Sequence, residues 1–278
     1  MYAIRHKTSK IHKNLCVGII TIPHSKKTKF GQSHIMKPYV DWFEEQGVRV
    51  IPIPYDTPVE NIDGYFHSIH GLLIPGGETP YILKQKSFLN TVTRFFELSL
   101  GEYFPIWGTC FGFELLIYLV AGHIRFKPFV AHGLYPIRLT SEGHRSKLFG
   151  SFPTSYIHRL ENTDSTAENH EFGISPRDFL ANDNLRRFYS VLATSQDESG
   201  KEYVAVIESK YYPIYGVQWH PERQPKDGTP FADFFIGELR KSKHRNRAGN
   251  GVRYLSSIMK PHKCRQYDEH KELMCYFF

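Results

Sequence analysis

The first half of the chain alternates short apolar runs with longer stretches of mixed or continuous apolar character. The short runs are rich in β-branched residues and end in Pro, Gly or polar residues, which predicts buried strands. The longer stretches have apolar residues at spacings of three and four, or are apolar throughout, which predicts helices. The predicted strands cover 15–22, 48–54, 70–77 and 103–107, and the predicted helices cover 35–46, 87–100 and 113–122. This alternation is typical of a parallel sheet flanked by helices.

From about residue 123 the pattern changes to shorter and more polar strand-like segments. They cover 135–140, 188–195, 202–209 and 212–219. The turns at 196–202 and 209–212 predict two antiparallel hairpins. Residues 172–182 are predicted to form a loop and a short helical turn, and 231–241 the last helix. The predicted fold class is α/β, with a mostly parallel central sheet, flanking helices and extra antiparallel strands in the second half.

The positive charge of the chain lies at its two ends. Of 278 residues, 15% are aromatic and 41% apolar, which predicts a folded globule. The formal net charge of the chain is +7. Residues 1–13 carry four Lys/Arg and no acid, 241–278 carry nine Lys/Arg and three acids, and 14–240 carry 22 basic and 25 acidic residues. A near-neutral body argues against nucleic-acid binding. The stretch 240–247, RKSKHRNR, is interpreted as a solubilising tail, with a nuclear or polyanion-contact signal as the alternative.

The lack of a recognisable targeting signal and the spacing of the cysteines predict a reducing, cytoplasmic location. No run approaches the ~18 apolar residues of a membrane span. The N-terminus lacks the apolar segment of a secretory signal, and the chain has no N-x-S/T sequon. Cys16, Cys110, Cys264 and Cys275 show neither metal-ligand spacing nor an evident disulfide framework.

Cys110 occupies the pattern of a nucleophile elbow. In IWGTCFGFELL, residues 106–116, it lies between Gly108 and Gly112, where a predicted strand turns into a predicted helix. The glycines allow a tight bend that exposes the side chain at the end of the strand. The helix N-terminus is expected to favour a thiolate. The alternative is a buried, inert cysteine beside a helix.

His220 and Glu222 supply the groups that a cysteine nucleophile needs. In GVQWHPER, residues 216–223, a predicted strand ends at His220 and Glu222 follows two residues later. An imidazole can accept the thiol proton and return it to a leaving amine, and a carboxylate can fix the imidazole tautomer. The alternative is a His-Pro-Glu turn that only caps a strand.

Together the two motifs resemble the class I glutamine amidotransferase superfamily, and within it gamma-glutamyl hydrolase most closely. Glu114 stands where amidotransferases usually have Gln, Trp219 stands where they usually have Phe, and NHEFGISPRDF, residues 169–179, resembles the central loop of the hydrolases. The resemblance predicts a flavodoxin-like catalytic domain over 14–241, between a basic arm at 1–13 and a basic tail at 242–278. One departure is His34, where the family commonly has tyrosine.

The resemblance implies a role for each catalytic group. Cys110 is expected to be the nucleophile, His220 the general acid/base and Glu222 its orienting partner. The backbone N–H groups of Gly77 and Phe111 are expected to form the oxyanion hole. Gly77 lies in the turn that ends the predicted strand 70–77, and Cys110 follows the strand 103–107. Parallel sheets bind ligands beyond the carboxyl ends of their strands.

The resemblance also implies substrate contacts from four residues. His170 matches a histidine of the family's substrate-binding loop and is expected to position a glutamate carboxylate. Gly76 lies in the turn beside the oxyanion hole. Glu114 and Trp219 are expected either to contact substrate or to support the site. Without the resemblance, His170 would be read as a surface loop residue.

The predicted function is a cysteine hydrolase that cleaves γ-glutamyl amides through a thioester. By resemblance its substrates are folylpoly-γ-glutamates, it needs no metal or organic cofactor, and it forms a homodimer. The charge distribution and the short apolar runs predict neither a nucleic-acid nor a membrane partner. One alternative is a glutaminase subunit that delivers ammonia to a synthetase; Glu114 and Trp219 speak against it. Another is a non-enzymatic binding protein, which the retained nucleophile, base and acid disfavour.

Overall fold

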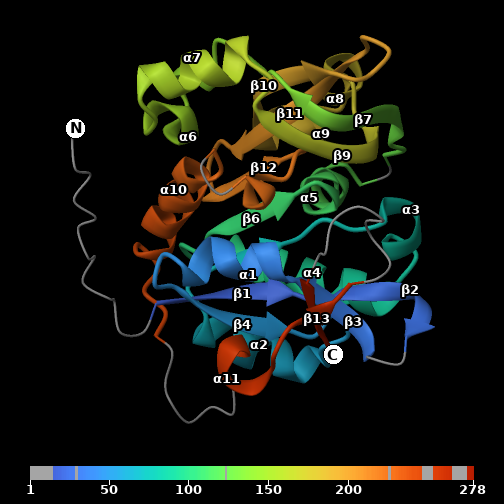
Figure 1. Cartoon of the computed structure of the whole chain (residues 1–278), viewed down its shortest axis with the longest axis vertical. Helices are drawn as coiled ribbons and strands as arrows, with labels where there is room; N and C mark the ends of the chain where they lie inside the picture. Colours follow the sequence, from blue (N-terminus) through green and yellow to red (C-terminus); the bar gives the residue numbers. More distant parts are fainter. Residues whose placement is uncertain (1–14, 29–30, 123, 225–226, 246–252, 265–273) are drawn as a thin grey trace.

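An eight-stranded sheet runs through the centre of the computed structural model, which describes residues 15–28, 31–122, 124–224, 227–245, 253–264 and 274–278. Its strand order is β4-β1-β5-β6-β12-β11-β10-β8 (Figure 1). The strands are β4 (Arg49–Ile53), β1 (Cys16–Ile20), β5 (Leu72–Ile74), β6 (Ile106–Thr109), β12 (Ile214–Val217), β11 (Glu202–Ser209), β10 (Tyr189–Gln196) and β8 (Arg138–Leu139). The first five run parallel, and the last three continue the sheet antiparallel.

Helices cover both faces of this sheet because alternate strand residues point to opposite sides. In β1, Val17 and Ile19 belong to one apolar cluster, whereas Cys16 and Ile20 belong to the other. The first cluster includes α1 (Lys37–Glu44) and α10 (Thr229–Leu239), and the second includes α2 (Val59–Ser68), α4 (Lys86–Ser99) and α5 (Phe111–Ala121). Burial of each large apolar side chain stabilises the fold by about 1.5–3 kcal/mol.

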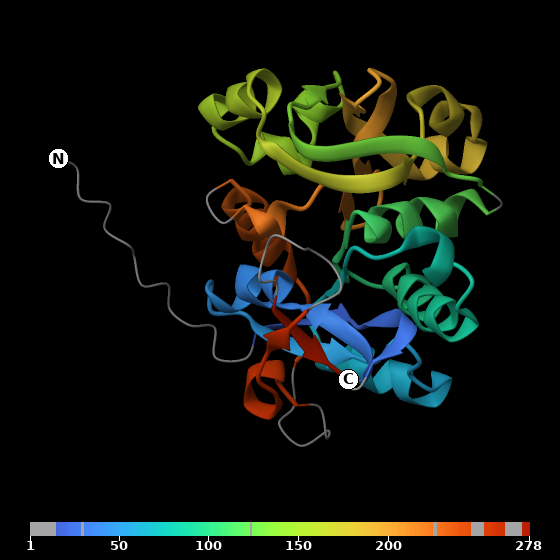
Figure 2. The same cartoon turned by 45° about the vertical axis from the view of Figure 1, so that its right-hand side comes forward.

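The chain after α5 adds a two-stranded ribbon and several short helices. The ribbon pairs β7 (Lys127–Tyr135) with β9 (Thr166–Gly173), and Figure 2 shows the two strands side by side above α5. The short helices are α3 (Thr79–Ile82), η1 (Gly143–Arg145), α6 (Lys147–Gly150), α7 (Thr154–Asn162), α8 (Pro176–Ala181), α9 (Asp183–Phe188), η2 (Pro221–Arg223) and α11 (Leu255–Ile258).

The described parts of the predicted tail are folded against the domain, so that prediction is wrong for them. A four-stranded sheet has the order β13-β14-β3-β2. Its strands are β13 (His262–Lys263), β14 (Met274–Phe277), β3 (Gly31–Met36) and β2 (Ile22–Thr28). The Phe278 amide donates to the Ser33 carbonyl at 2.9 Å, which extends the pairing to the last residue of the chain.

Cys264 and Cys275 form a disulfide, which corrects the expectation of no disulfide framework. Their Cα atoms are 5.5 Å apart. Antiparallel pairing of Lys263 with Met274 brings the two cysteines together. The spacing of the cysteines could not reveal this because the contact depends on the pairing of two strands.

The predicted α/β class is confirmed, and so are the alternating strands and helices of the first half. Both predicted hairpins are present, β10–β11 and β11–β12. The helix α2 and the β2–β3 pair were not predicted, because their sequences carry only short and polar-interrupted patterns. Residues 1–13 and 246–247, assigned above to the arm and the polar stretch, lie outside the described residues. No helix in the described part of the chain is long and apolar enough to cross a membrane.

Candidate active site

Cys110 sits at a sharp bend between β6 and α5, as the elbow pattern predicts. Its backbone has φ 53° and ψ −108°, and within the described residues no other non-glycine residue has positive φ. Such a conformation is strained for an L-residue and persists only where the surroundings enforce it. A Cβ on Gly112 would lie 2.0 Å from the Ile74 carbonyl oxygen, and one on Gly108 would lie 2.6 Å from the Gly112 carbonyl. Gly112 therefore lets the elbow pack against β5, and Gly108 lets β6 pack against the first turn of α5.

The environment of Cys110 opposes the thiolate that the elbow pattern predicts. Burial raises the pKa of Cys110 strongly, and the nearby Glu114 carboxylate raises it further. The Phe111 amide and the Arg223 charge lower the same pKa, with smaller effects. The helix N-terminus thus stabilises the thiolate, but burial outweighs it. The sulfur needs a base before it can attack.

His220 and Glu222 form the predicted base and its orienting partner. The His220 Nδ1 is 2.7 Å from Glu222 Oε1, and both side chains are almost completely buried. A Nδ1–H that donates to the carboxylate leaves Nε2 as the proton acceptor. Burial lowers the pKa of His220, followed by the Arg223 charge, while Glu222 opposes both. The imidazole is therefore neutral and able to accept a proton at neutral pH.

The sheet brings His220 to Cys110 through strand register. Thr109 pairs with Val217 in the parallel β6–β12 ladder, so the chain segments that follow emerge at the same sheet edge. Both side chains converge on Gly76: an added Cβ there would lie 2.8 Å from His220 Cε1 and 3.4 Å from Cys110 Cβ. A side chain at Gly76 would therefore collide with the His220 ring and contact Cys110.

The Gly76–Gly77 turn follows β5 and is fixed by a tyrosine. The Gly76 amide donates to the Tyr39 hydroxyl at 2.8 Å, and this hydroxyl is 3.3 Å from His220 Nδ1. Among the hydrogen bonds of the described residues, none uses the Gly77 amide. Gly77 thus retains the free N–H that an oxyanion hole requires. The Phe111 amide, the second predicted donor, is directed at the Cys110 thiol.

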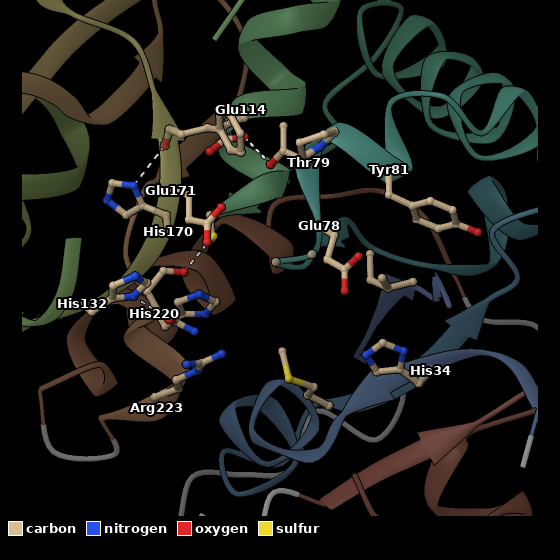
Figure 3. A pocket seen from close by; sticks show the side chains of 18 residues that line it. His34, Glu78, Thr79, Tyr81, Glu114, His132, His170, Glu171, His220 and Arg223 are labelled. Atoms are coloured by element: carbon tan, nitrogen blue, oxygen red, sulfur yellow. Dashed lines mark hydrogen bonds between the residues drawn. The ribbon is translucent and has the colours of Figure 1, made fainter. Parts of the chain in front are cut away.

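These groups open onto a cavity of about 560 Å³ (Figure 3). Of the residues predicted above, the cavity is lined by Cys110, His220, Gly76, Gly77, Glu114 and His170. Trp219, predicted as a substrate or support residue, does not line it. Its ring is buried against Phe231, with the ring centroids 5.5 Å apart. Trp219 therefore supports the segment that carries His220.

Glu114 is a buried carboxyl held between two polar side chains. It accepts hydrogen bonds from the Thr79 hydroxyl and from Gln218 Nε2, the latter at 3.1 Å. Burial raises the pKa of Glu114 to about 7. Its charge raises the pKa of Cys110. Glu114 thus both lines the cavity and opposes ionisation of the nucleophile.

His170 lies in strand β9, so the expected loop position is wrong. The side chain is 2% exposed, with Nδ1 3.0 Å from the Phe172 carbonyl and Nε2 3.2 Å from Glu168 Oε2. Burial opposes its protonation, but Glu168 outweighs burial and raises the pKa of His170. Nδ1 is therefore hydrogen-bonded to the chain, whereas Nε2 lies beside Glu168 as an ion-pair partner without a hydrogen bond.

Several cavity residues were not predicted. They are Ile22, His34, Met36, Glu78, Thr79, Pro80, Tyr81, His132, Asn169, Glu171, Phe172 and Arg223, of which only His34 had been singled out. Arg223 directly follows the His-Pro-Glu segment, and this position could have predicted that it lines the cavity. His132 of β7 carries no such signal, because it reaches the site through the pairing of β7 with β9. Asn169, Glu171 and Phe172 of β9 lie in the stretch 169–179 that carried the family resemblance, but no role had been assigned to them. Within the described residues, no group of three or more His, Cys, Asp or Glu is arranged to hold a metal ion.

Comparison with known proteins shows which family this chain is similar to. Residues 33–237 match the family model "Glutamine amidotransferase class-I". The chain is 36% identical over 260 residues to gamma-glutamyl hydrolase B of Dictyostelium discoideum, which covers 84% of this chain and 75% of that protein. It is 33% identical over 238 residues to human gamma-glutamyl hydrolase, which covers 77% and 74%.

A solved structure supports the fold at low sequence identity. The glutaminase domain of Trypanosoma brucei CTPS with bound acivicin superposes with a TM-score of 0.59 at 11% identity. The match covers 84% of this chain and 97% of that domain. At this identity the likeness shows the shared fold alone.

Proposed function

Because the chain belongs to the class I glutamine amidotransferase family and, within it, to the gamma-glutamyl hydrolases, we propose that it hydrolyses γ-glutamyl amide bonds through Cys110. The observation that carries this proposal is the convergence of Cys110 and His220 on Gly76, with Glu222 hydrogen-bonded behind the imidazole. A free amide at Gly77 adjoins the same point.

In the acylation step, His220 Nε2 takes the thiol proton as Sγ attacks the γ-carbonyl carbon. The Gly77 and Phe111 amides stabilise the negative charge that develops on the carbonyl oxygen, and loss of one such donor typically costs ~10²–10³ in rate. The C–N bond then breaks, and the leaving nitrogen takes the proton from Nε2. A thioester to Cys110 remains.

In the deacylation step, water replaces the departed amine. His220 Nε2 accepts a proton from the water as its oxygen attacks the thioester carbon, and the C–S bond breaks. The sulfur recovers the proton, which returns Cys110 to the neutral thiol that its burial favours. Glu222 stabilises the imidazolium that forms in each step.

We propose folylpoly-γ-glutamates as the substrates, in line with the family resemblance of the motifs. The test is incubation of wild-type protein and Cys110→Ala with a pteroyl γ-linked polyglutamate, with products separated by chromatography. Wild type should release glutamate or short polyglutamates, and Cys110→Ala should release none. If wild type leaves this compound intact but deamidates free glutamine, the protein is a glutaminase instead.

The Cys264–Cys275 disulfide bears on where the protein works. Disulfides persist in oxidising compartments and are rare in the cytosol. We therefore propose an oxidising compartment in place of the cytoplasmic one predicted from sequence. A homodimer stays a prediction, which light scattering of the purified protein would test.

A further inference from the structure

Arg223 brings a positive charge into the catalytic cavity. Among the described residues that line the cavity, it is the only lysine or arginine. It follows the catalytic His-Pro-Glu segment directly, so η2 fixes its position relative to His220. Figure 3 shows its guanidinium on the same side of the cavity as His220.

The guanidinium keeps its hydrogen-bonding capacity. Its Nε is 3.8 Å from Glu222 Oε1, beyond hydrogen-bonding range. No hydrogen bond among the described residues uses any guanidinium nitrogen of Arg223, and its side chain is 25% exposed. A planar group with free parallel donors suits bidentate binding of a carboxylate.

The other charged groups of the cavity do not offer an equivalent anion site. The charge of a protonated His170 is offset by Glu168, whose Oε2 lies 3.2 Å from His170 Nε2. Burial lowers the pKa of His34 to about 3, so its ring is neutral. Glu78 and Glu171 project into the cavity and would repel an anion placed beside them (Figure 3). The part of the cavity beside Arg223 is therefore where a substrate carboxylate is stabilised.

The chemistry of a γ-glutamyl bond indicates which carboxylate of the substrate lies beside Arg223. A γ-linked glutamate that leaves as an amine carries its free α-carboxylate on the carbon bonded to the leaving nitrogen. That nitrogen must meet His220 Nε2 to receive its proton. Arg223 acts on the same imidazole, since its charge lowers the pKa of His220.

We infer that Arg223 binds the α-carboxylate of the leaving glutamate and so makes the enzyme selective for amino-acid leaving groups over simple amines. This inference rests on the proposed function. It distinguishes a hydrolase of γ-linked polyglutamates from a glutaminase, whose leaving group, ammonia, has no carboxylate to bind.

The test compares two substrates that differ only in the leaving α-carboxylate: p-aminobenzoyl-γ-glutamyl-glutamate and p-aminobenzoyl-γ-glutamyl-4-aminobutyrate. Wild type should prefer the glutamate compound by roughly 10²-fold in kcat/KM, as expected for loss of a charged hydrogen-bonding partner. Arg223→Gln should lose most of this preference, and Arg223→Lys should keep part of it. Arg187→Gln removes a charge from an exposed position of α9 and should behave as wild type.

A purely electrostatic or structural role gives a different result. Loss of the Arg223 charge raises the pKa of His220, so the acid limb of the pH–rate profile should move upward equally for both substrates. If Arg223→Gln slows both substrates by the same factor, or if wild type shows no preference, the inference is overturned while the hydrolase function stands. If wild type cleaves neither compound, the proposed function fails and the inference with it.

Discussion

The Tyr39 hydroxyl ties the oxyanion turn to the catalytic base. It accepts the Gly76 amide at 2.8 Å and lies 3.3 Å from His220 Nδ1, although Tyr39 and His220 are 181 residues apart in the chain. The ring is completely buried in α1. One phenol therefore sets the distance between the turn that carries Gly77 and the imidazole that serves Cys110.

Tyr39→Phe should reduce both stability and activity. The buried Gly76 amide would lose its acceptor, at a cost of about 1–3 kcal/mol in the free energy of unfolding. We expect kcat to fall by roughly ten-fold, because a small displacement of Gly77 misaligns the oxyanion hole. Urea unfolding and steady-state kinetics check both. Tyr65→Phe on α2 is the control, and equal behaviour of the two variants would contradict this role for Tyr39.

Glu114→Gln should make Cys110 more reactive toward alkylation. The Glu114 charge raises the pKa of the thiol, so its removal lowers that pKa and increases the thiolate fraction at a given pH. The iodoacetamide rate constant at neutral pH should rise by roughly 3–10-fold. Glu78→Gln removes another cavity carboxylate, one that does not act on the thiol, and should leave the rate unchanged. A rate unaltered in Glu114→Gln would show that burial alone keeps the thiol neutral.

Stability should fall in acid because His34 is buried as a neutral ring. Burial and then the neighbouring His24 lower the pKa of His34 to about 3, and the two rings stack with centroids 4.6 Å apart. Between pH 6.5 and about 3 the unfolded chain binds a proton on this residue that the folded chain does not. The free energy of unfolding therefore decreases as pH falls through this window, by up to about 1.4 kcal/mol per pH unit.

His34→Gln should flatten this part of the stability profile, measured by urea unfolding at several pH values. His158→Gln, which replaces an exposed histidine on α7, is the matched control and should retain the wild-type slope. Identical slopes for wild type and His34→Gln would refute the assignment.

Loss of the Cys264–Cys275 disulfide should destabilise the domain and disturb the cavity. Replacement of both cysteines by serine should lower the free energy of unfolding by about 2–3 kcal/mol, as expected for closure of a short loop. A change in KM should accompany it, because β14 pairs with β3, which carries His34 and Met36 of the cavity wall. Reductant should shift the Tm of wild type but not of the double variant. Equal Tm values for oxidised and reduced wild type would contradict the prediction.

Local patterns were sufficient to predict the framework of the site. The alternation of apolar runs with helical stretches predicted the order of β1, α1, β4, β5, α4, β6 and α5, because strand and helix periodicity are properties of neighbouring residues. Glycines on both sides of Cys110 predicted the elbow, since the bend depends on backbone freedom at two nearby positions. The spacing of two predicted the His220–Glu222 pair, although the structure forms it through the turn η2 rather than along an extended segment.

The sequence by itself determined the α/β alternation, the elbow and the His-Pro-Glu segment, because each depends on residues adjacent in the chain. Only the tertiary structure decided the protonation of Cys110, since burial and Glu114 act on the sulfur from several elements at once. It also decided that His170 pairs with Glu168 in a strand, that Arg223 enters the cavity, and that the chain end returns to pair with β3. These features depend on contacts between distant segments, and a linear pattern does not record which segments will meet.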